Sequence, residues 1–467
     1  MGNHPLHAAA AGRAAATIVA QLLTHGADVN ATQNGGFTAL HEAAFKNDMA
    51  LVNVLLVHGA NPGWRAVLAA KRHEEPMNRV ALVGAGVSKF GVRKATYRDL
   101  IWEAGKACFD SVPGLKPKDV EGLVVGSVMP ERTAFQSHVS SLAAEALGIK
   151  PSALSARTEH MCASGTVGIR YAYAFIAAGL ADLVMVLGVE KLNQPSGDEA
   201  ILNMGTGVDR EWEAAFGLTA PPCFALAAQR HMARYGTTEE QLARVGVKNH
   251  NHAAKNPNAH FGKGATLDQV MCSKMIATPL RLFMCSPITD GAAAVLVASE
   301  ERARVLTDTP VWISGTGQAL DGFQLTSLPD DYAHWPAMKR AADAAYAMAG
   351  ITAKDVDLAE VHDCFSIAEL IAYEELGFCK KGEAGGFVEA GRSDYGGDVV
   401  VNPRGGLIGC GHPLGATGVA QAAEVFVQLR GEAGARQVPD AAVGLTHNNS
   451  GMGEHVVMIY GRDAGRR

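Results

Sequence analysis

Two stretches of the chain begin in the same way, and this duplication limits the fold more than any other feature. Residues 79–86 and 311–317 each form a short apolar strand pattern that runs into glycine. Helical and strand patterns then alternate, with helices expected at 98–111, 136–147, 165–180, 335–349 and 365–376 and strands at 120–128, 183–189, 356–361, 443–445 and 456–460. Such alternation is typical of the α/β class. We therefore predict two similar halves, residues 78–304 and 305–467.

An insertion interrupts the first half. Residues 190–285 follow a strand pattern and are rich in His, Asn and Met. Their polarity predicts a loop domain that covers the first half and lies over a site.

The composition is that of a globular protein with a large core. The chain has 467 residues, of which 48% are apolar and 19% charged, enough for roughly three domains of about 150 residues. Lys and Arg number 41 and Asp and Glu 47, so the formal charge is −6. An acidic balance argues against nucleic acid as a partner. The longest apolar stretch, 171–189, is broken by Asp182 and predicts a buried helix and strand, not a membrane span.

The cysteines and the first residues indicate a reducing compartment. None of the eight cysteines forms a CxxC pair, so neither a zinc ribbon nor a disulfide scaffold is expected. The start of the chain lacks the basic and apolar regions of a signal peptide. We expect a cytoplasmic protein.

The first 76 residues carry an internal repeat. Leu6-His7-Ala8-Ala9 recurs 34 residues later as Leu40-His41-Glu42-Ala43-Ala44, and His25-Gly26-Ala27 recurs 33 residues later as His58-Gly59-Ala60. Period and turn residues resemble the ankyrin repeat, which implies a short all-α segment over residues 1–70 and a linker over 71–77. Two repeats bury little core, so the segment is expected to be marginal alone. The alternative is that it docks on the rest of the chain. The segment is interpreted as a binding site for a protein partner or as the remnant of a gene fusion, and a further possibility is that Met77 is the biological start.

Two later segments carry nucleophile and base candidates. Cys162, in Glu159-His-Met-Cys-Ala-Ser-Gly165, stands at a predicted strand-to-helix turn, where the helix N-terminus is expected to lower the thiol pKa. The alternative is an inert buried cysteine. His412 lies in a segment with six glycines in seventeen residues, 402–418, where the backbone must approach a neighbour closely. A catalytic histidine fits this loop better than a core histidine.

Two further segments could complete a site. His362-Asp363-Cys364-Phe365 follows a strand pattern and offers an acid/base thiol, or else a helix cap at Asp363 beside an incidental cysteine. The loop 446–453 (Thr-His-Asn-Asn-Ser-Gly-Met-Gly) could direct backbone N–H groups at an oxyanion, or could be a plain turn.

Together these segments resemble the thiolase family over roughly residues 79–465. Cys162-Ala-Ser164 matches its Cys-x-Ser nucleophile motif, Gly411-His-Pro413 its Gly-His-Pro motif, and Ser286-Pro-Ile-Thr-Asp-Gly-Ala-Ala293 its segment near the pantetheine. Two departures from the family pattern are informative. His362-Asp-Cys-Phe365 replaces Asn-Glu-Ala-Phe, and His447-Asn-Asn449 replaces the late Cys-x-Gly loop. The first is the version of the sterol-carrier-protein-type branch.

The resemblance implies a fold, roles and partners. The fold would be two βαβαβαββ halves in five layers with an inserted loop domain. Catalysis would use Cys162 as the acyl carrier, His412 as its base, Cys364 at the α-carbon, and His362 with His412 near the enolate oxygen. The loop with Asn449 and Gly451 would serve an oxyanion, and Ser286 would bind substrate. No metal or other cofactor is implied. The substrates would be acetyl-CoA, acyl-CoA or 3-oxoacyl-CoA with CoA, and the protein a homodimer or homotetramer in fatty acid and lipid metabolism.

Two other functions remain open on the sequence. A protein of the same fold could instead perform a retro-aldol or other carbon–carbon cleavage on a CoA ester, although Cys162 argues against this. The chain could also be an inactive interaction protein that binds through its ankyrin-like repeats, against which the joint presence of Cys162, Cys364 and His412 argues.

Overall fold

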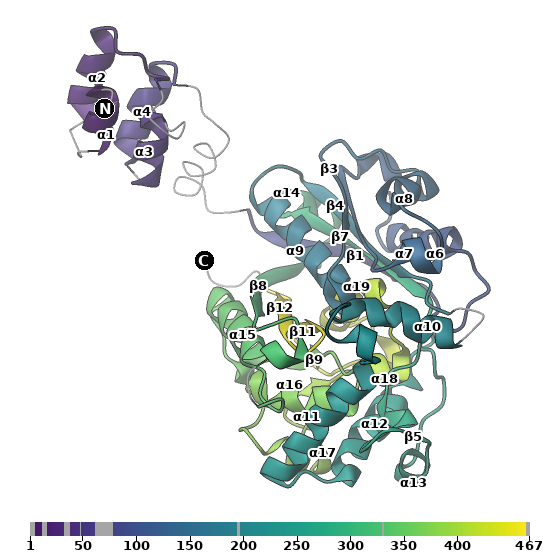
Figure 1. Ribbon diagram of the computed structural model, residues 1–467. Coiled ribbons are helices and arrows are strands. Elements are labelled where there is room, and N and C mark those ends of the chain that lie inside the picture. The colour runs from purple at the N-terminus through teal and green to yellow at the C-terminus, as the bar shows by residue number, and fades with distance from the viewer. Residues whose placement is uncertain are drawn as a thin grey trace. The chain divides into compact units, whose positions relative to one another are not determined.

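The computed structural model describes residues 5–11, 16–31, 38–46, 48–60, 78–193, 197–328 and 331–463 (Figure 1). Its internal contacts divide the chain into two compact units, residues 1–78 and 79–467. The predicted linker, 71–77, lies outside the described residues.

In its described residues, the N-terminal unit consists of two helix pairs. Its helices are α1 (Pro5–Ala11), α2 (Ala16–Thr24), α3 (Ala39–Phe45) and α4 (Met49–Val57). Their apolar faces meet in one small core that includes Leu6, Val19, Leu40, Leu51 and Leu55. The repeated glycines at 26 and 59 follow α2 and α4 with φ of +89° and +84°, a conformation that favours glycine at a helix end. The repeat of the sequence is therefore a repeat of structure.

The larger unit is built on a ten-stranded mixed sheet in which the two halves have the same topology. The strands run in the order β10 (Val400–Val401), β9 (Leu358–Glu360), β11 (Val443–Ser450), β12 (Glu454–Gly461), β8 (Val311–Leu320), β1 (Val80–Val87), β7 (Gly291–Ser299), β4 (Leu183–Glu190), β2 (Gly122–Gly126) and β3 (Leu154–Thr158). If the five strands of each half are numbered in chain order, both halves place them in the order 3-2-4-5-1 from the edge of the sheet to its centre. The first strands, β1 and β8, pair antiparallel where Ala81 lies opposite Trp312. The predicted duplication is confirmed.

Five layers result from how the helices cover these strands. Helices α9 (Ser164–Ala177) and α19 (Leu414–Leu429) share one core with strands of both halves, through side chains such as Ile169, Val419, Val186 and Met458. The outer faces are covered by α6 (Tyr97–Asp110) and α8 (Val139–Leu147) on the first half and by α15 (Pro336–Ala349) and α16 (Ser366–Glu375) on the second. Helices α9 and α19 are thus the central layer, and each follows the third strand of its half. The predicted five-layer α/β fold is confirmed.

Glycine allows the central layer to approach the strands closely. A Cβ at Gly188 in β4 would lie 2.3 Å from the carbonyl oxygen of Gly415 in α19, and a Cβ at Gly165 in α9 would lie 2.7 Å from the same oxygen. Real Cβ atoms do not come this close to a backbone oxygen, so the helix would have to move. The close approach expected of the glycine-rich segment is confirmed.

We expect Gly188→Ala to lower the free energy of unfolding by about 3 kcal/mol, because the new methyl overpacks a contact with rigid backbone. A fall in melting temperature of several degrees would show it. Gly262→Ala is the matched control, since a Cβ there would meet no described atom within 4 Å. Equal melting temperatures for the two variants would contradict the expectation.

The insertion consists of α10 (Gly197–Met204), α11 (Ala220–Tyr235), α12 (Glu239–Ala253), α13 (Leu267–Met271) and the hairpin β5–β6 (Met275–Ala277, Leu280–Arg281). Helices α11 and α12 pack on the second half, where the ring of Phe224 stacks on Phe365 at 4.7 Å between centroids and Leu242 shares a core with Ile367. The prediction that the insertion covers the first half was wrong for these helices, because polarity marks an insertion but does not say which half its apolar positions complement.

The remaining α-helices in the described part of residues 79–467 are short or connect strands. They are α7 (Pro130–Thr133), α14 (Glu300–Leu306), α17 (Ala384–Glu389) and α18 (Gly406–Cys410). Across the described ranges, no helix has the length and apolar character needed to cross a membrane.

Candidate active site

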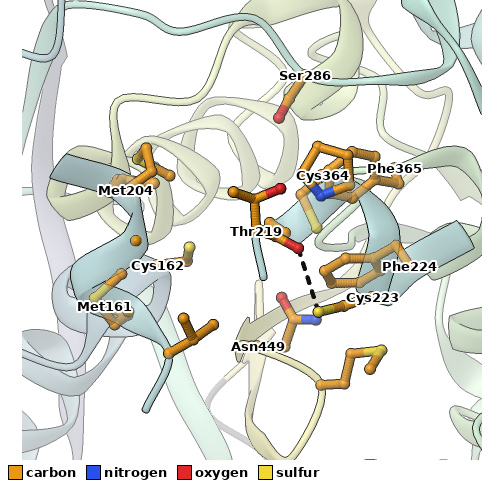
Figure 2. A pocket seen from close by; sticks show the side chains of 18 of the residues that line it. Met161, Cys162, Met204, Thr219, Cys223, Phe224, Ser286, Cys364, Phe365 and Asn449 are labelled. Carbon is orange, nitrogen blue, oxygen red and sulfur yellow. Dashed lines mark hydrogen bonds between the residues drawn. The ribbon is translucent and has the colours of Figure 1, made fainter. Parts of the chain in front are cut away.

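Cys162 lies in a tight turn between β3 and α9. The turn is a short 3₁₀ segment, Met161–Ala163, and Met161 adopts a φ of +42°, which is unusual for a non-glycine residue. The Ser164 hydroxyl stabilises it by accepting from the N–H of His160 at 2.8 Å and donating to the carbonyl of Met161 at 2.6 Å. Figure 2 shows Cys162 beside Met161 and Met204 at one end of a cavity.

His412 precedes the other central helix, α19, so the two residues occupy equivalent places in the two halves. Its N–H donates to the Thr289 hydroxyl at 3.1 Å, and its Nδ1 lies 2.7 Å from Thr417 Oγ1. The Thr417 hydroxyl donates to the carbonyl of Pro413 at 3.2 Å, so it accepts the proton of His412 Nδ1. The lone pair is then on Nε2, which is buried and has no hydrogen-bond partner among the described residues.

His362 has the opposite tautomer. The Thr166 hydroxyl donates to Asn448 Oδ1, which leaves Asn448 Nδ2 to donate to His362 Nδ1 at 3.0 Å. His362 therefore carries its proton on Nε2, again buried and unpartnered within the described part of the chain. One imidazole offers a lone pair to the site and the other offers a hydrogen-bond donor.

The structure brings the predicted site residues together. One ligand atom from each of Cys162, His362 and His412 lies within 4.8 Å of the others, and the two rings meet edge to face at 4.9 Å. They line a cavity of about 290 Å³ together with the other four predicted residues, Ser286, Cys364, Asn449 and Gly451. Figure 2 shows Cys364, Phe365 and Phe224 on the side of the cavity away from Met161.

Asp363 fixes the segment that carries His362 and Cys364. Its carboxylate accepts the N–H groups of Leu407 at 2.7 Å and Ile408 at 3.2 Å, and the amide of Asn249 at 2.7 Å. Asp363 thus caps the N-terminus of α18, which lies in the glycine-rich segment. The alternative interpretation required it to cap the helix that follows it in sequence, and that interpretation was wrong. This bond ties the segment of Cys364 to the segment of His412.

Burial keeps the four reactive groups uncharged. It raises the pKa of Cys162 to about 12 and the pKa of Cys364 well above its usual value, and it lowers the pKa of His412 to about 3 and the pKa of His362 well below its usual value. The prediction that the helix N-terminus gives Cys162 a low pKa was wrong, because burial raises the pKa of this thiol more than its backbone hydrogen bond lowers it. The resting thiol of Cys162 therefore needs a base before it can react as a thiolate.

Three positioning residues were not singled out from the sequence. Thr417 and Asn448 set the two tautomers, and Thr289 holds the backbone of His412. Thr417 stands within the quoted glycine-rich segment and Asn448 within the quoted loop, but nothing in either pattern says which ring nitrogen a side chain will reach. His447 is not among the residues that line the cavity; its Nε2 lies 3.1 Å from Nδ1 of His455.

Family models match most of the chain. The thiolase N-terminal domain matches residues 80–301, the thiolase C-terminal domain-like model residues 317–462, and a model of three ankyrin repeats residues 1–65. The acetyl-CoA acetyltransferase of Methanothermobacter thermautotrophicus is 46% identical over 378 residues, which cover 81% of this chain and 97% of the relative. Sterol carrier protein 2 of Bos taurus is 38% identical over 402 residues, which cover 82% and 72%.

Solved structures share the fold. The Ltp2-ChsH2(DUF35) aldolase aligns with a TM-score of 0.72 at 29% identity over 83% of this chain and 99% of that one. Human mitochondrial 3-ketoacyl-CoA thiolase in complex with CoA aligns with a TM-score of 0.63 at 19% identity over 83% of this chain and 98% of that one.

Fold, site and relatives together define an acyltransferase. The chain belongs to the thiolase family and is a thiolase that carries ankyrin repeats.

Proposed function

We propose that this thiolase makes or cleaves 3-oxoacyl-CoA through an acyl group on Cys162, as an acetyl-CoA acetyltransferase. The observation that carries this is the meeting of Cys162, His362 and His412 within 4.8 Å in a cavity that Cys364 also lines. Claisen chemistry needs an acyl carrier, a base for an α-proton and donors for oxyanions. The cavity offers a residue for each task.

Acylation uses Cys162 and His412. The thiol proton passes to His412 Nε2, Cys162 Sγ attacks the thioester carbonyl, and the C–S bond to CoA breaks. The departing CoA thiolate takes the proton from His412 and leaves as the free thiol. The backbone N–H of Cys162 and those of the loop with Asn449 and Gly451 hold the oxyanion of the tetrahedral intermediate.

Condensation uses Cys364. Its thiol gives a proton to His412, and the thiolate removes an α-proton from a second acetyl-CoA. The Nε2–H of His362 and the protonated His412 stabilise the enolate oxygen. The enolate carbon then bonds to the acyl carbon, and the Cys162 thiolate is expelled and recovers its proton from His412. Thiolysis is the reverse sequence, and neither direction needs a metal or redox group.

Trapping the acyl group tests this function. We expect incubation with acetyl-CoA, followed by acid quench and mass spectrometry, to add one acetyl mass to the peptide that contains Cys162. Cys162→Ser should lose the thiol-linked adduct, whereas Cys223→Ser, another cysteine that lines the cavity, should keep it. A folded protein that never acquires the adduct would instead favour a lyase, such as the aldolase whose structure it resembles.

The cavity beside Cys162 has room for an acyl chain. Met161, Met204 and Ile288 are partly buried there around Leu192 and Leu414, and methionine adapts its shape to apolar ligands. A Cβ at Gly205, which also lines the cavity, would meet no described atom within 4 Å. We therefore propose that 3-oxoacyl-CoA longer than acetoacetyl-CoA is accepted.

Substitution at Gly205 tests whether the acyl chain lies in this part of the cavity. Each buried methylene contributes about 0.8 kcal/mol, or roughly a fourfold gain in kcat/KM. We expect Gly205→Val to lower the ratio of kcat/KM for 3-oxohexanoyl-CoA over acetoacetyl-CoA by about tenfold, because its side chain fills that space. Gly262→Val is the control, because a Cβ at Gly262 also meets no described atom within 4 Å but lies at the exposed surface. This variant should leave the ratio unaltered. A ratio that does not respond at Gly205 would place the acyl chain elsewhere.

Assembly and location are also proposals. The active form is proposed to be a homodimer or homotetramer, and the ankyrin unit is proposed to bind a protein partner. None of the eight cysteines, all of which the structure describes, forms a disulfide, which supports a reducing compartment such as the cytoplasm.

A further inference from the structure

The catalytic cavity also has the donor set of a transition-metal site. A thiol sulfur and two imidazole nitrogens lie within 4.8 Å of one another on Cys162, His362 and His412. Both Nδ1 atoms are engaged, by Asn448 and Thr417, while both Nε2 atoms are buried without a partner among the described residues. The nitrogens free for a ligand are therefore the Nε2 atoms.

We propose that Zn²⁺ binds reversibly to Cys162 Sγ, His362 Nε2 and His412 Nε2 and inhibits the enzyme. Thiolate and imidazole favour Zn²⁺ over Mg²⁺ and Ca²⁺, which take oxygen ligands. Three protein ligands with a fourth position open to the cavity is a common arrangement for zinc. The metal occupies the sulfur and the lone pair that acylation uses, so binding of metal and acylation exclude one another.

The distances require only a small adjustment. Zinc bonds of 2.0–2.3 Å in a tetrahedral arrangement place the ligand atoms roughly 3.3–3.8 Å apart. A spread of up to 4.8 Å closes to this with side-chain movements of about 1 Å. Cys162 is partly exposed and lines the open cavity, so the ion has a path to it.

Binding of Zn²⁺ requires one proton to leave Cys162 and one to move within the His362 ring. Cys162 releases its thiol proton to solvent as the Zn–S bond forms. His412 already has its lone pair on Nε2. His362 must move its proton from Nε2 to Nδ1, which then donates to Asn448 Oδ1 once that amide turns over. The Thr166 hydroxyl allows this because it can accept from the amide as well as donate to it. Histidine ligands in zinc sites are held by such bonds at the second nitrogen.

Alkylation measured residue by residue tests the site without any assay of catalysis. The metal-free full-length protein is treated with iodoacetamide, with and without Zn²⁺, and the labelled peptides are quantified. We expect Zn²⁺ to slow labelling of Cys162 by about tenfold or more, since a metal-bound thiolate is shielded, and EDTA to restore it. Cys272, which is exposed, is the internal control and should keep its rate. Mg²⁺ at the same concentration should protect neither.

Co²⁺ as a spectroscopic probe tests the ligands. One equivalent should give the thiolate-to-cobalt charge-transfer absorption of a tetrahedral site, which Zn²⁺ abolishes by displacement. Cys162→Ser should lose the band, and His412→Gln should weaken Co²⁺ binding by about tenfold or more, with near-native circular dichroism as the test of folding. A band that survives in folded Cys162→Ser, or Cys162 labelling that Zn²⁺ leaves unaltered, would overturn the site. Acetyl trapping is measured without metal, so the two proposals can fail separately.

Discussion

Cys364→Ala is expected to lose condensation while it keeps acylation. The variant should still take one acetyl group from acetyl-CoA onto Cys162, because His412 and Cys162 perform that step without Cys364. Formation of acetoacetyl-CoA should fall by about 10³-fold, within the range for loss of a general acid/base group. A quenched time course that follows acetyl-enzyme and acetoacetyl-CoA together measures both.

The structure makes Cys364→Ala a mild change elsewhere. The backbone carbonyl of Cys364, which accepts from the N–H of Ser286 at 2.9 Å, is retained. Its neighbour Asp363 still caps α18. Cys379→Ala is the matched control, since this cysteine is partly buried but is not among the residues lining the cavity. If Cys364→Ala loses both steps to the same degree, the division of labour between the two cysteines is wrong.

The sequence predicts the fold well because its signals are local. Short apolar runs that end in glycine, such as 79–86 and 311–317, mark the first strand of each half, and the alternation that follows defines an α/β chain. Local signals do not predict how elements that are distant in sequence pack together. Phe224 and Leu242 are apolar positions in a polar insertion, and only the folded chain shows that they meet Phe365 and Ile367 of the second half.

In the site, too, the motifs predict which residues take part, whereas their protonation depends on the folded structure. Cys162, Cys364 and His412 stand out by their motifs, and the structure places them around one cavity. Their protonation does not follow from the motifs, because it depends on burial and on side chains far away in sequence. The helix N-terminus at Cys162 suggested a low thiol pKa, yet burial raises it to about 12. Asn448, which sets the tautomer of His362, is 86 residues away from it.

His412→Ala is expected to change how acylation depends on pH. In the wild-type enzyme the pKa of His412, about 3, and that of Cys162, about 12, both lie outside the range from pH 6 to 9. The neutral imidazole and the thiol therefore persist across this range, and the acylation rate should be nearly flat. Without His412 only the thiolate reacts. Burial, Glu190 and Glu159 raise the pKa of Cys162, and both glutamates remain in the variant. Its thiolate fraction should therefore rise about tenfold with each pH unit below that pKa.

The expected loss is that of a general base. At pH 8 a thiol of pKa about 12 is ionised to roughly one part in 10⁴, so acylation of His412→Ala should fall by about 10²- to 10⁴-fold, and the loss should be about tenfold smaller at pH 9. The burst of acetyl-enzyme in a rapid quench, taken at four pH values, measures both the loss and its slope. His455→Ala is the control, because this buried histidine is bonded to His447 and is not among the residues that line the cavity. A flat profile for His412→Ala would mean that another group takes the proton of Cys162, and the tautomer set by Thr417 would then have no part in the reaction.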